Sequence, residues 1–116
     1  MYFYKNKENG EVINSVSEIN DERFMLLVAN TTNGATEKHL PVYSINDNSI
    51  YVKIGEVDHP MSEEHYIMWI ALVSGGEIIK INLKPGDAPE GMFEYKEGAT
   101  IYSYCNLHGL WKVDIK

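Results

Sequence analysis

Apolar and polar residues alternate along much of this chain, and no other feature of the sequence limits the possible folds as strongly. In residues 50–55 the apolar side chains of Ile50, Val52 and Ile54 occupy every second position, and residues 101–105 repeat the pattern. Because successive side chains of a β-strand point to opposite faces, this spacing predicts strands. Further strands are expected at residues 11–15, 23–29, 66–74, 77–83, 92–95 and 111–115.

Turn residues separate these segments at short intervals. Gly75 and Gly76 lie between two apolar segments and favour a two-residue hairpin turn, whose central positions have positive φ. A second turn is expected at residues 84–87, with the sequence Lys-Pro-Gly-Asp. Many short strands with frequent turns predict an all-β fold, either an antiparallel sandwich or a barrel. Residues 31–36 are expected to link a polar N-terminal arm to this sandwich.

Composition and charge argue against two classes of partner. The formal net charge is -7 and no two Lys or Arg residues are adjacent, so nucleic acid would be repelled over most of the surface. The longest nearly unbroken apolar stretch, residues 66–73, is much shorter than the roughly 20 residues that span a bilayer. Residues 1–10 are too polar for a signal peptide. We therefore expect a soluble, cytoplasmic protein without a nucleic-acid or membrane partner.

The only cysteine and the four histidines are the residues most able to carry chemistry. A single Cys105 excludes an intrachain disulfide, and leaves a thiolate ligand, a reactive thiol or a buried free cysteine. His39, His59, His65 and His108 all fall at predicted loops or strand ends. Each histidine alone would more often be structural, so only their spacing along the chain can indicate a metal site.

That spacing favours one shared metal site. His59 and His65 lie at the two ends of a short loop, and Pro60 biases His59 toward an extended backbone that aims its ring inward. Cys105 lies two positions after Ser103 on the predicted inner face of its strand, and His108 follows in the next turn. A thiolate and several imidazoles suit iron, zinc or copper, and exclude magnesium and calcium as natural occupants.

The number of candidate ligands narrows the choice of metal. A structural zinc site usually closes at four ligands, whereas four histidines and a cysteine supply five and favour a redox metal with one open position, such as iron. Blue copper sites also use a Cys-x-x-His turn, but no methionine follows His108 as an axial ligand. A cupredoxin-like electron carrier and a zinc-stabilised binding module stay open as alternatives.

Three separated segments of the sequence resemble the motifs of a known family. They are Glu37-Lys38-His39-Leu40-Pro41, Gly55-Glu56-Val57-Asp58-His59-Pro60-Met61 with His65, and Cys105-Asn106-Leu107-His108-Gly109-Leu110-Trp111. Together they resemble superoxide reductases, the neelaredoxin and desulfoferrodoxin family, from about Thr36 to the C-terminus. The resemblance implies an immunoglobulin-like antiparallel β-sandwich over residues 36–116. Its single non-haem iron would have the imidazoles of His39, His59, His65 and His108 in a square, with the Cys105 thiolate axial.

The same resemblance implies an enzyme that reduces superoxide to hydrogen peroxide by one electron. A rubredoxin-like protein would supply the electron, and the chain would form a homodimer or homotetramer. Lys38 would attract the superoxide anion to the open face of the iron, and Glu37 would fill the sixth position on ferric iron. Appreciable dismutation of superoxide stays open, because both reactions begin at ferrous iron.

The N-terminal arm, residues 1–35, departs from part of that family. It resembles the opening of a desulfoferrodoxin, in which two cysteine pairs hold a second iron. Asn6 and Asn9 stand where the first pair would be, and the pair expected before Met25 is also missing. Since such a centre needs four thiolates, we predict one iron per chain and no second FeCys4 centre. The arm is expected to be a degenerate desulforedoxin-like module with a structural or dimerising role.

Overall fold

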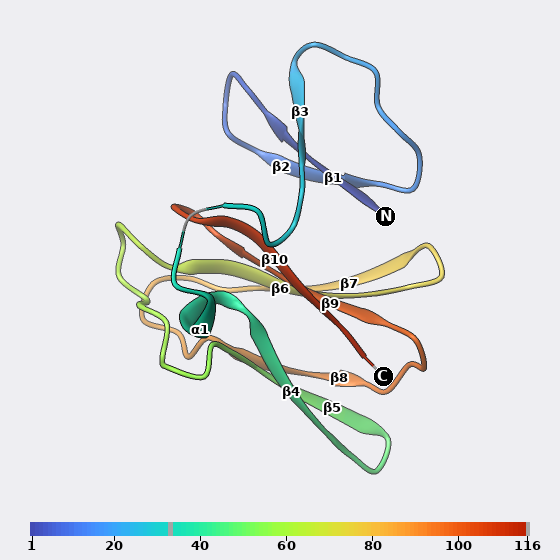
Figure 1. Cartoon of the computed structure of the whole chain (residues 1–116), viewed down its shortest axis with the longest axis vertical. Helices are drawn as coiled ribbons and strands as arrows, with labels where there is room; N and C mark the ends of the chain where they lie inside the picture. The colour runs from blue at the N-terminus through green and yellow to red at the C-terminus, as the bar shows by residue number, and fades with distance from the viewer. Residues whose placement is uncertain (33, 116) are drawn as a thin grey trace.

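The computed structural model describes residues 1–32 and 34–115, in which ten strands and one helical turn are found (Figure 1). The elements are β1 (Tyr2–Asn6), β2 (Val12–Ser15), β3 (Phe24–Leu27), α1 (Thr36–His39), β4 (Pro41–Asn46), β5 (Ser49–Ile54), β6 (Ile67–Ser74), β7 (Glu77–Asn82), β8 (Glu90–Glu94), β9 (Thr100–Cys105) and β10 (Gly109–Asp114). Within the described residues no helix is long and apolar enough to cross a membrane.

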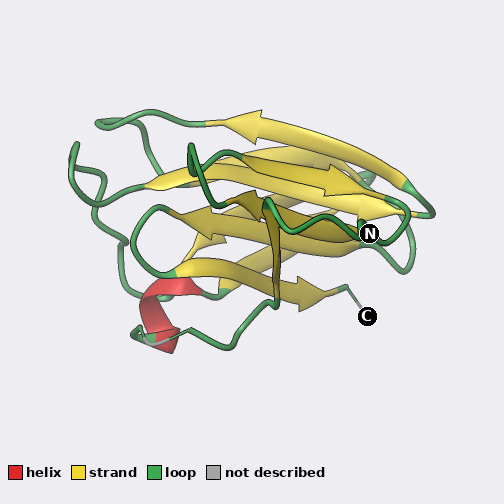
Figure 2. Cartoon of the chain, turned by 90° about the horizontal axis from the view of Figure 1, so that it is seen from above, coloured by secondary structure: helices red, strands yellow, loops and turns green. Residues whose placement is uncertain are grey.

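The strands form three antiparallel sheets. Their strand orders are β2-β1-β3, β10-β9-β6-β7 and β4-β5-β8. Figure 2 shows the strands stacked in layers, with α1 at one end of the stack. The β4-β5-β8 and β10-β9-β6-β7 sheets enclose the main core. Ile50, Val52 and Ile54 of the first sheet are completely buried there, together with Ile70 and Ile101 of the second. The predicted all-β antiparallel sandwich is therefore confirmed, and the alternating residues of β5 do face its core.

The predicted turns are present, but the structure also contains two strands and a helical turn that the sequence did not predict. Gly75 and Gly76 have φ values of 57° and 89° and close the β6–β7 hairpin, as expected for positive-φ turn positions. The sequence analysis missed β1, β4 and α1. Strand β4 begins with Pro41 and lies at a sheet edge, where the missing N–H of proline is tolerated. Helix α1 has only four residues, too few to show a helical period.

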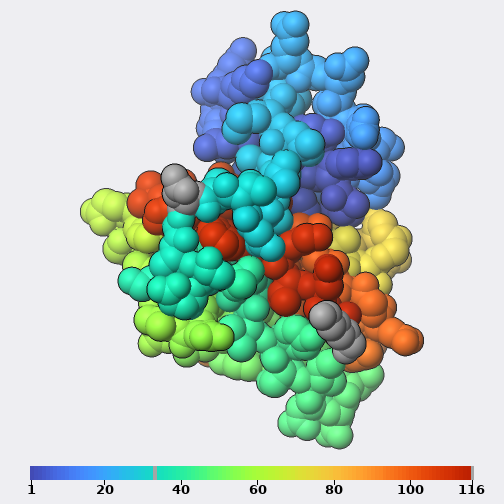
Figure 3. All heavy atoms as spheres, in the orientation of Figure 1, coloured from blue at the N-terminus to red at the C-terminus, as the bar shows by residue number. Residues whose placement is uncertain are grey.

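The small N-terminal sheet docks on the outer face of the four-stranded sheet through β1. Phe3 is almost completely buried, with its ring 5.6 Å from that of Trp69 and 4.6 Å from that of Tyr102 between centroids. Leu110 of β10 belongs to the same apolar cluster. Figure 3 shows the N-terminal segment, in blue, lying against the C-terminal strands, in red. A division of the chain between residues 35 and 36 stays a prediction, although β3 ends at Leu27 and α1 begins at Thr36.

Candidate metal centre

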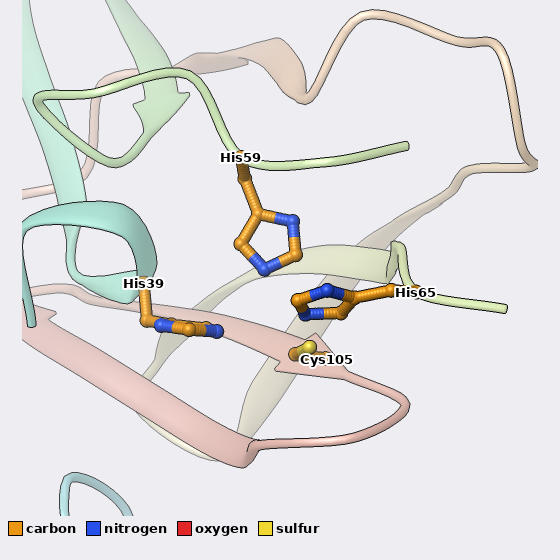
Figure 4. A group of neighbouring side chains, drawn as sticks. All are labelled: His39, His59, His65 and Cys105. Carbon is orange, nitrogen blue, oxygen red and sulfur yellow. The ribbon is translucent and has the colours of Figure 1, made fainter. Parts of the chain in front are cut away.

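Three of the four histidines predicted as ligands meet the cysteine at one end of the sandwich (Figure 4). His39 ends α1, His59 and His65 lie in the loop between β5 and β6, and Cys105 ends β9. One potential ligand atom from each of these four residues lies within 4.8 Å of the others. His39, which the sequence placed in a loop or at a strand end, is instead the last residue of the helical turn.

Two of the imidazoles are oriented by backbone carbonyls. Nδ1 of His39 lies 2.7 Å from the carbonyl oxygen of Ala35, and Nδ1 of His59 lies 2.6 Å from that of Pro60. In the tautomer that these contacts assign, Nδ1 carries the proton and donates it, so Nε2 has a free lone pair. Metal-binding histidines are commonly held in this way, with the other ring nitrogen donating to a carbonyl.

Three buried nitrogens of this group have no hydrogen-bond partner among the described residues. They are Nε2 of His39, of His59 and of His65. A buried polar atom without a partner is costly, and a native structure rarely contains three of them side by side. A metal ion that accepts their lone pairs would satisfy all three, so these residues fit the metal that the sequence predicted.

His108 completes a ring of four imidazoles. The ring centroids of His39, His59, His65 and His108 lie 4.6 to 4.9 Å apart in that cyclic order, and His39 and His65 are 6.3 Å apart across the ring. Four short sides and a longer diagonal describe a nearly square arrangement. His108 turns Nδ1 rather than Nε2 toward Cys105, at 3.9 Å from the sulfur.

Cys105 lies at the end of a buried strand and is itself completely buried. Burial raises the pKa of its thiol, and the backbone N–H groups of Leu107 and His108, which donate to the sulfur, lower the pKa in part. A metal ion is the strong positive charge that would convert this thiol to a thiolate ligand.

Close packing brings the ligand-bearing loops together. Gly55 has a φ of 85°, and a Cβ atom there would lie 2.6 Å from the carbonyl oxygen of Lys38, so only glycine fits between α1 and the His59 loop. Asn106 joins the other two loops, because its Oδ1 accepts from Tyr66 N at 2.9 Å and its Nδ2 donates to Glu64 O at 2.9 Å. The sequence analysis gave Asn106 no role, and its place between two predicted ligands was the available signal.

Glu37 and Lys38 flank the histidines without joining them. Both side chains are exposed, and the carboxylate of Glu37 is not among the ligand atoms within 4.8 Å of one another. It lines a surface hollow beside Leu40 and Glu56. Burial lowers the pKa of His65, and the charges of His108 and Lys38 lower it further, so the field of Lys38 reaches the ring of imidazoles.

Comparison with known proteins decides the family. A family model described as desulfoferrodoxin matches residues 31–114. This chain belongs to the desulfoferrodoxin family. Among its relatives, a desulfoferrodoxin of Clostridium acetobutylicum is 49% identical over 89 residues, which cover 77% of this chain and 71% of that protein. A superoxide reductase of Pyrococcus horikoshii is 31% identical over 100 residues, covering 69% and 87% of the two chains.

Solved structures agree with the desulfoferrodoxin assignment. The superoxide reductase of Treponema pallidum is 30% identical, covers 97% of both chains and has a TM-score of 0.75. A superoxide reductase of Giardia intestinalis, titled 1Fe-SOR, is 30% identical, with a TM-score of 0.61 over 69% of this chain and 98% of that one. The resemblance to superoxide reductases is thereby confirmed, and with it the prediction of an oxidoreductase. The alignment to the Treponema pallidum protein includes nearly all of the chain and so extends to the N-terminal sheet.

Proposed function

We propose that this protein is a superoxide reductase, which reduces superoxide by one electron to hydrogen peroxide at a single non-haem iron. The observation that carries the proposal is the group of three unpaired, buried Nε2 atoms gathered with one buried sulfur. The names of the family members support the same reaction. The ligand set would be His39, His59, His65, Cys105 and, through Nδ1, His108.

This donor set suits iron with one position left for a small substrate. Four imidazoles and a thiolate are ligands that iron would accept, and these five would leave a further position for a small molecule. When bound, iron supplies a one-electron reductant and a Lewis acid at the same position. The chain supplies the rest, since it holds the four rings in a square, keeps the sulfur in an apolar core and moderates it with two backbone amides.

Lys38 gives the substrate a local attraction that the whole protein does not. The formal net charge of -7 repels an anion at long range, whereas the ammonium group of Lys38 is close enough to affect His39 and His65. Attraction of this kind changes the rate of encounter and its dependence on salt. We assign Lys38 to guiding superoxide toward the imidazoles.

Glu37 is proposed as the ligand that fills the sixth position when the metal is ferric. A carboxylate oxygen is a hard donor, which suits the more highly charged ion. Because its side chain is exposed and lies outside the group of ligand atoms, it has to turn toward the histidines to do so. Its position two residues before His39, in α1, keeps that movement short.

The remaining parts of the proposal concern partners and organisation. The chain has one cysteine, so a second centre with four thiolates cannot form within it, and the electron has to come from another molecule, such as a rubredoxin-like protein. The hypothesis also includes one iron per chain and residues 1–35 as a separate module. It further includes a homo-oligomer and a cytoplasmic location.

One experiment tests the reaction directly. Iron-loaded, anaerobically reduced protein receives a stoichiometric pulse of superoxide while its visible absorption is recorded. We expect superoxide to disappear once per iron, with the appearance of a thiolate-to-ferric charge-transfer band that is missing in Cys105→Ser. If the reduced protein consumes no superoxide and no band develops, the enzyme proposal fails and a structural zinc or a copper site takes its place.

Removal of the positive charge of Lys38 gives a second test. In Lys38→Gln the second-order rate with superoxide should fall about tenfold at low salt and depend less on ionic strength. The matched control is Lys7→Gln, which removes the same charge from the exposed turn that follows β1. Equal rates in both variants would remove Lys38 from the proposal without affecting the metal ligands.

A further inference from the structure

The segment between β3 and α1 is fastened to the edge of the four-stranded sheet. Asn30 has a φ of 63°, a left-handed conformation that asparagine tolerates. Its backbone N–H donates to the carbonyl of Leu110 at 3.0 Å, and its side chain both donates to the carbonyl of Lys112 at 3.2 Å and accepts from Lys112 N at 2.9 Å. One residue thus makes three hydrogen bonds to β10, the edge strand of its sheet.

The next residues of the same segment reach the candidate metal centre. The hydroxyl of Thr32 donates to the carbonyl of His108. Gly34 lies against two imidazoles, because a Cβ atom there would be 3.2 Å from Cε1 of His39 and 3.2 Å from Cγ of His108. Gly109 leaves room for Thr32, since a Cβ atom on Gly109 would lie 3.0 Å from Cγ2 of Thr32.

His108 is held differently from the other rings. His39 and His59 are oriented through Nδ1, which bonds to a backbone carbonyl, and their free Nε2 faces the centre. His108 directs Nδ1 toward the sulfur of Cys105, so that nitrogen is not available for an orienting bond when it binds metal. The contacts that hold it are to its own carbonyl, which accepts from Thr32 Oγ1 and, at 3.0 Å, from Trp111 Nε1.

We propose that Asn30, Thr32 and Gly34 form a strap that positions His108 and thereby raises the metal affinity of the sandwich. The strap rests on the proposed function in one respect, that His108 is a metal ligand. Thr32 is a positioning residue, which acts on the metal through the backbone of His108. Asn30 fixes the strap to β10, directly after the N-terminal sheet ends, and Gly34 sets how closely the strap approaches the rings.

The test compares two neighbouring threonines. Thr32→Val keeps the shape of the side chain and removes the hydroxyl that reaches His108, whereas Thr31→Val removes a hydroxyl that donates to Val28 O at 2.7 Å within the turn. Each variant is loaded with Co²⁺ alone, and release to an excess of chelator is followed by the thiolate-to-cobalt absorption. We expect about tenfold faster release from Thr32→Val, with a shifted band, and release within about twofold of wild type from Thr31→Val.

Thermal unfolding of the metal-free proteins separates positioning from general damage. The midpoint of metal-free Thr32→Val should match that of Thr31→Val, so that the difference appears only with metal bound. Asn30→Gly, which keeps the left-handed backbone and loses two side-chain bonds, should also release Co²⁺ faster. Wild-type release from both Thr32→Val and Asn30→Gly would overturn the strap. Failure of the wild-type chain to retain Co²⁺ would instead overturn the metal site itself, and the strap with it.

Discussion

The N-terminal sheet and the sandwich are both built from short antiparallel strands, yet within the described residues only the sandwich gathers side chains that could bind a metal. The core of the sandwich contains completely buried residues such as Ile54 and Ile67, whose strands end at the metal centre. In the N-terminal sheet, Met25 and Leu26 are 47% and 48% exposed, and the buried Phe3 packs against the sandwich. The strand pattern therefore sets the fold of both regions, whereas a site arises only where a rigid core holds the loops still.

Two asparagine side chains close the turn between β1 and β2 of the N-terminal sheet. Oδ1 of Asn6 accepts from the backbone N–H of Glu8 at 2.8 Å and of Asn9 at 3.4 Å, and Oδ1 of Asn9 accepts from Glu11 N at 2.9 Å. Asn6 and Asn9 are the positions where the family resemblance would place cysteines. Side-chain amides thus close this turn by hydrogen bonds of the kind that asparagine makes in turns.

Removal of the metal should have the largest effect, and it should fall on one region. Because a bound ion stabilises only the folded chain, a free concentration about a thousand times the dissociation constant contributes about 4 kcal/mol to the free energy of unfolding. Amide hydrogen exchange with and without chelator should show lost protection around His39 and in residues 59–65, and little change in β1 to β3. Equal loss in both regions would show that the two unfold as one unit.

A buried and an exposed leucine compare the packing of the two regions. Leu72→Ala removes a side chain that is 1% exposed and should lower the free energy of unfolding by about 3 kcal/mol. Leu26→Ala, at a position that is 48% exposed, should cost less than about 1 kcal/mol. Urea unfolding of the metal-free variants measures both values. A cost at Leu26 as large as that at Leu72 would mean that another surface covers Leu26 in solution.

Acid should weaken the metal-free sandwich through its histidines. Burial is the main cause that lowers the pKa of His59 to about 4, so between about pH 6.5 and 4 the unfolded chain binds more protons than the folded one. Stability therefore falls as the pH drops through this window, by about 3 kcal/mol for this group. Chemical unfolding at a series of pH values measures the loss, and His59→Gln should flatten it. An unchanged slope in that variant would assign the acid sensitivity elsewhere.

The N-terminal sheet should respond to acid only at lower pH. The guanidinium of Arg23 hydrogen-bonds to Asp21 and lowers the pKa of that carboxyl to about 2. This contribution is present above the ordinary pKa of aspartate and is lost as the pH falls toward 2. It should be small, because surface ion pairs are screened by solvent. The chemical shifts of β3 in metal-free protein, followed by NMR, would report this titration separately from that of the histidines.

The smallest effect is expected at the turn of the N-terminal sheet. Asn6→Ala removes the acceptor for two exposed backbone N–H groups and should lower the free energy of unfolding by about 1 kcal/mol or less. The control is Asn48→Ala, in a sandwich turn where its backbone carbonyl accepts from Tyr95 N and survives the substitution. Cobalt release should be unchanged in both variants. Faster release from Asn6→Ala would show that the N-terminal turn also influences the metal centre.

The sequence predicted the parts of this molecule that depend on local pattern. Alternation located β5 and β9, the glycine pair at 75–76 located the β6–β7 turn, and the phase of Ser103 placed Cys105 inside. Strand β1 was missed because Phe3 and Tyr4 are adjacent and both buried, one against the sandwich, so the period of two is lost. Burial on both faces of a strand is a property of tertiary packing, which a local pattern does not contain.

For the candidate site too, the sequence predicted the side chains that gather there but not the backbone groups that hold them. The grouping of three histidines with Cys105 could be predicted because imidazoles and a thiol are recognisable by type and spacing. The groups that hold them could not, since Ala35 and Pro60 act through backbone carbonyls and Ser103 donates to the carbonyl of His39 from a distant strand. Any residue carries a carbonyl, so its role becomes visible only when the chain is folded.

The positions of the two tryptophans make the protein its own optical reporter. Trp69 stacks on Phe3 where the N-terminal sheet docks, and Trp111 stacks on the ring of His39 with centroids 5.0 Å apart. Fluorescence of Trp111 should therefore be quenched when a paramagnetic ion binds between the four imidazoles. The emission of Trp69 should shift to longer wavelength when the N-terminal sheet detaches. A Trp111→Phe variant leaves one emitter at the docking surface, and Trp69→Phe leaves one at the imidazoles, so each event can be timed without an added label.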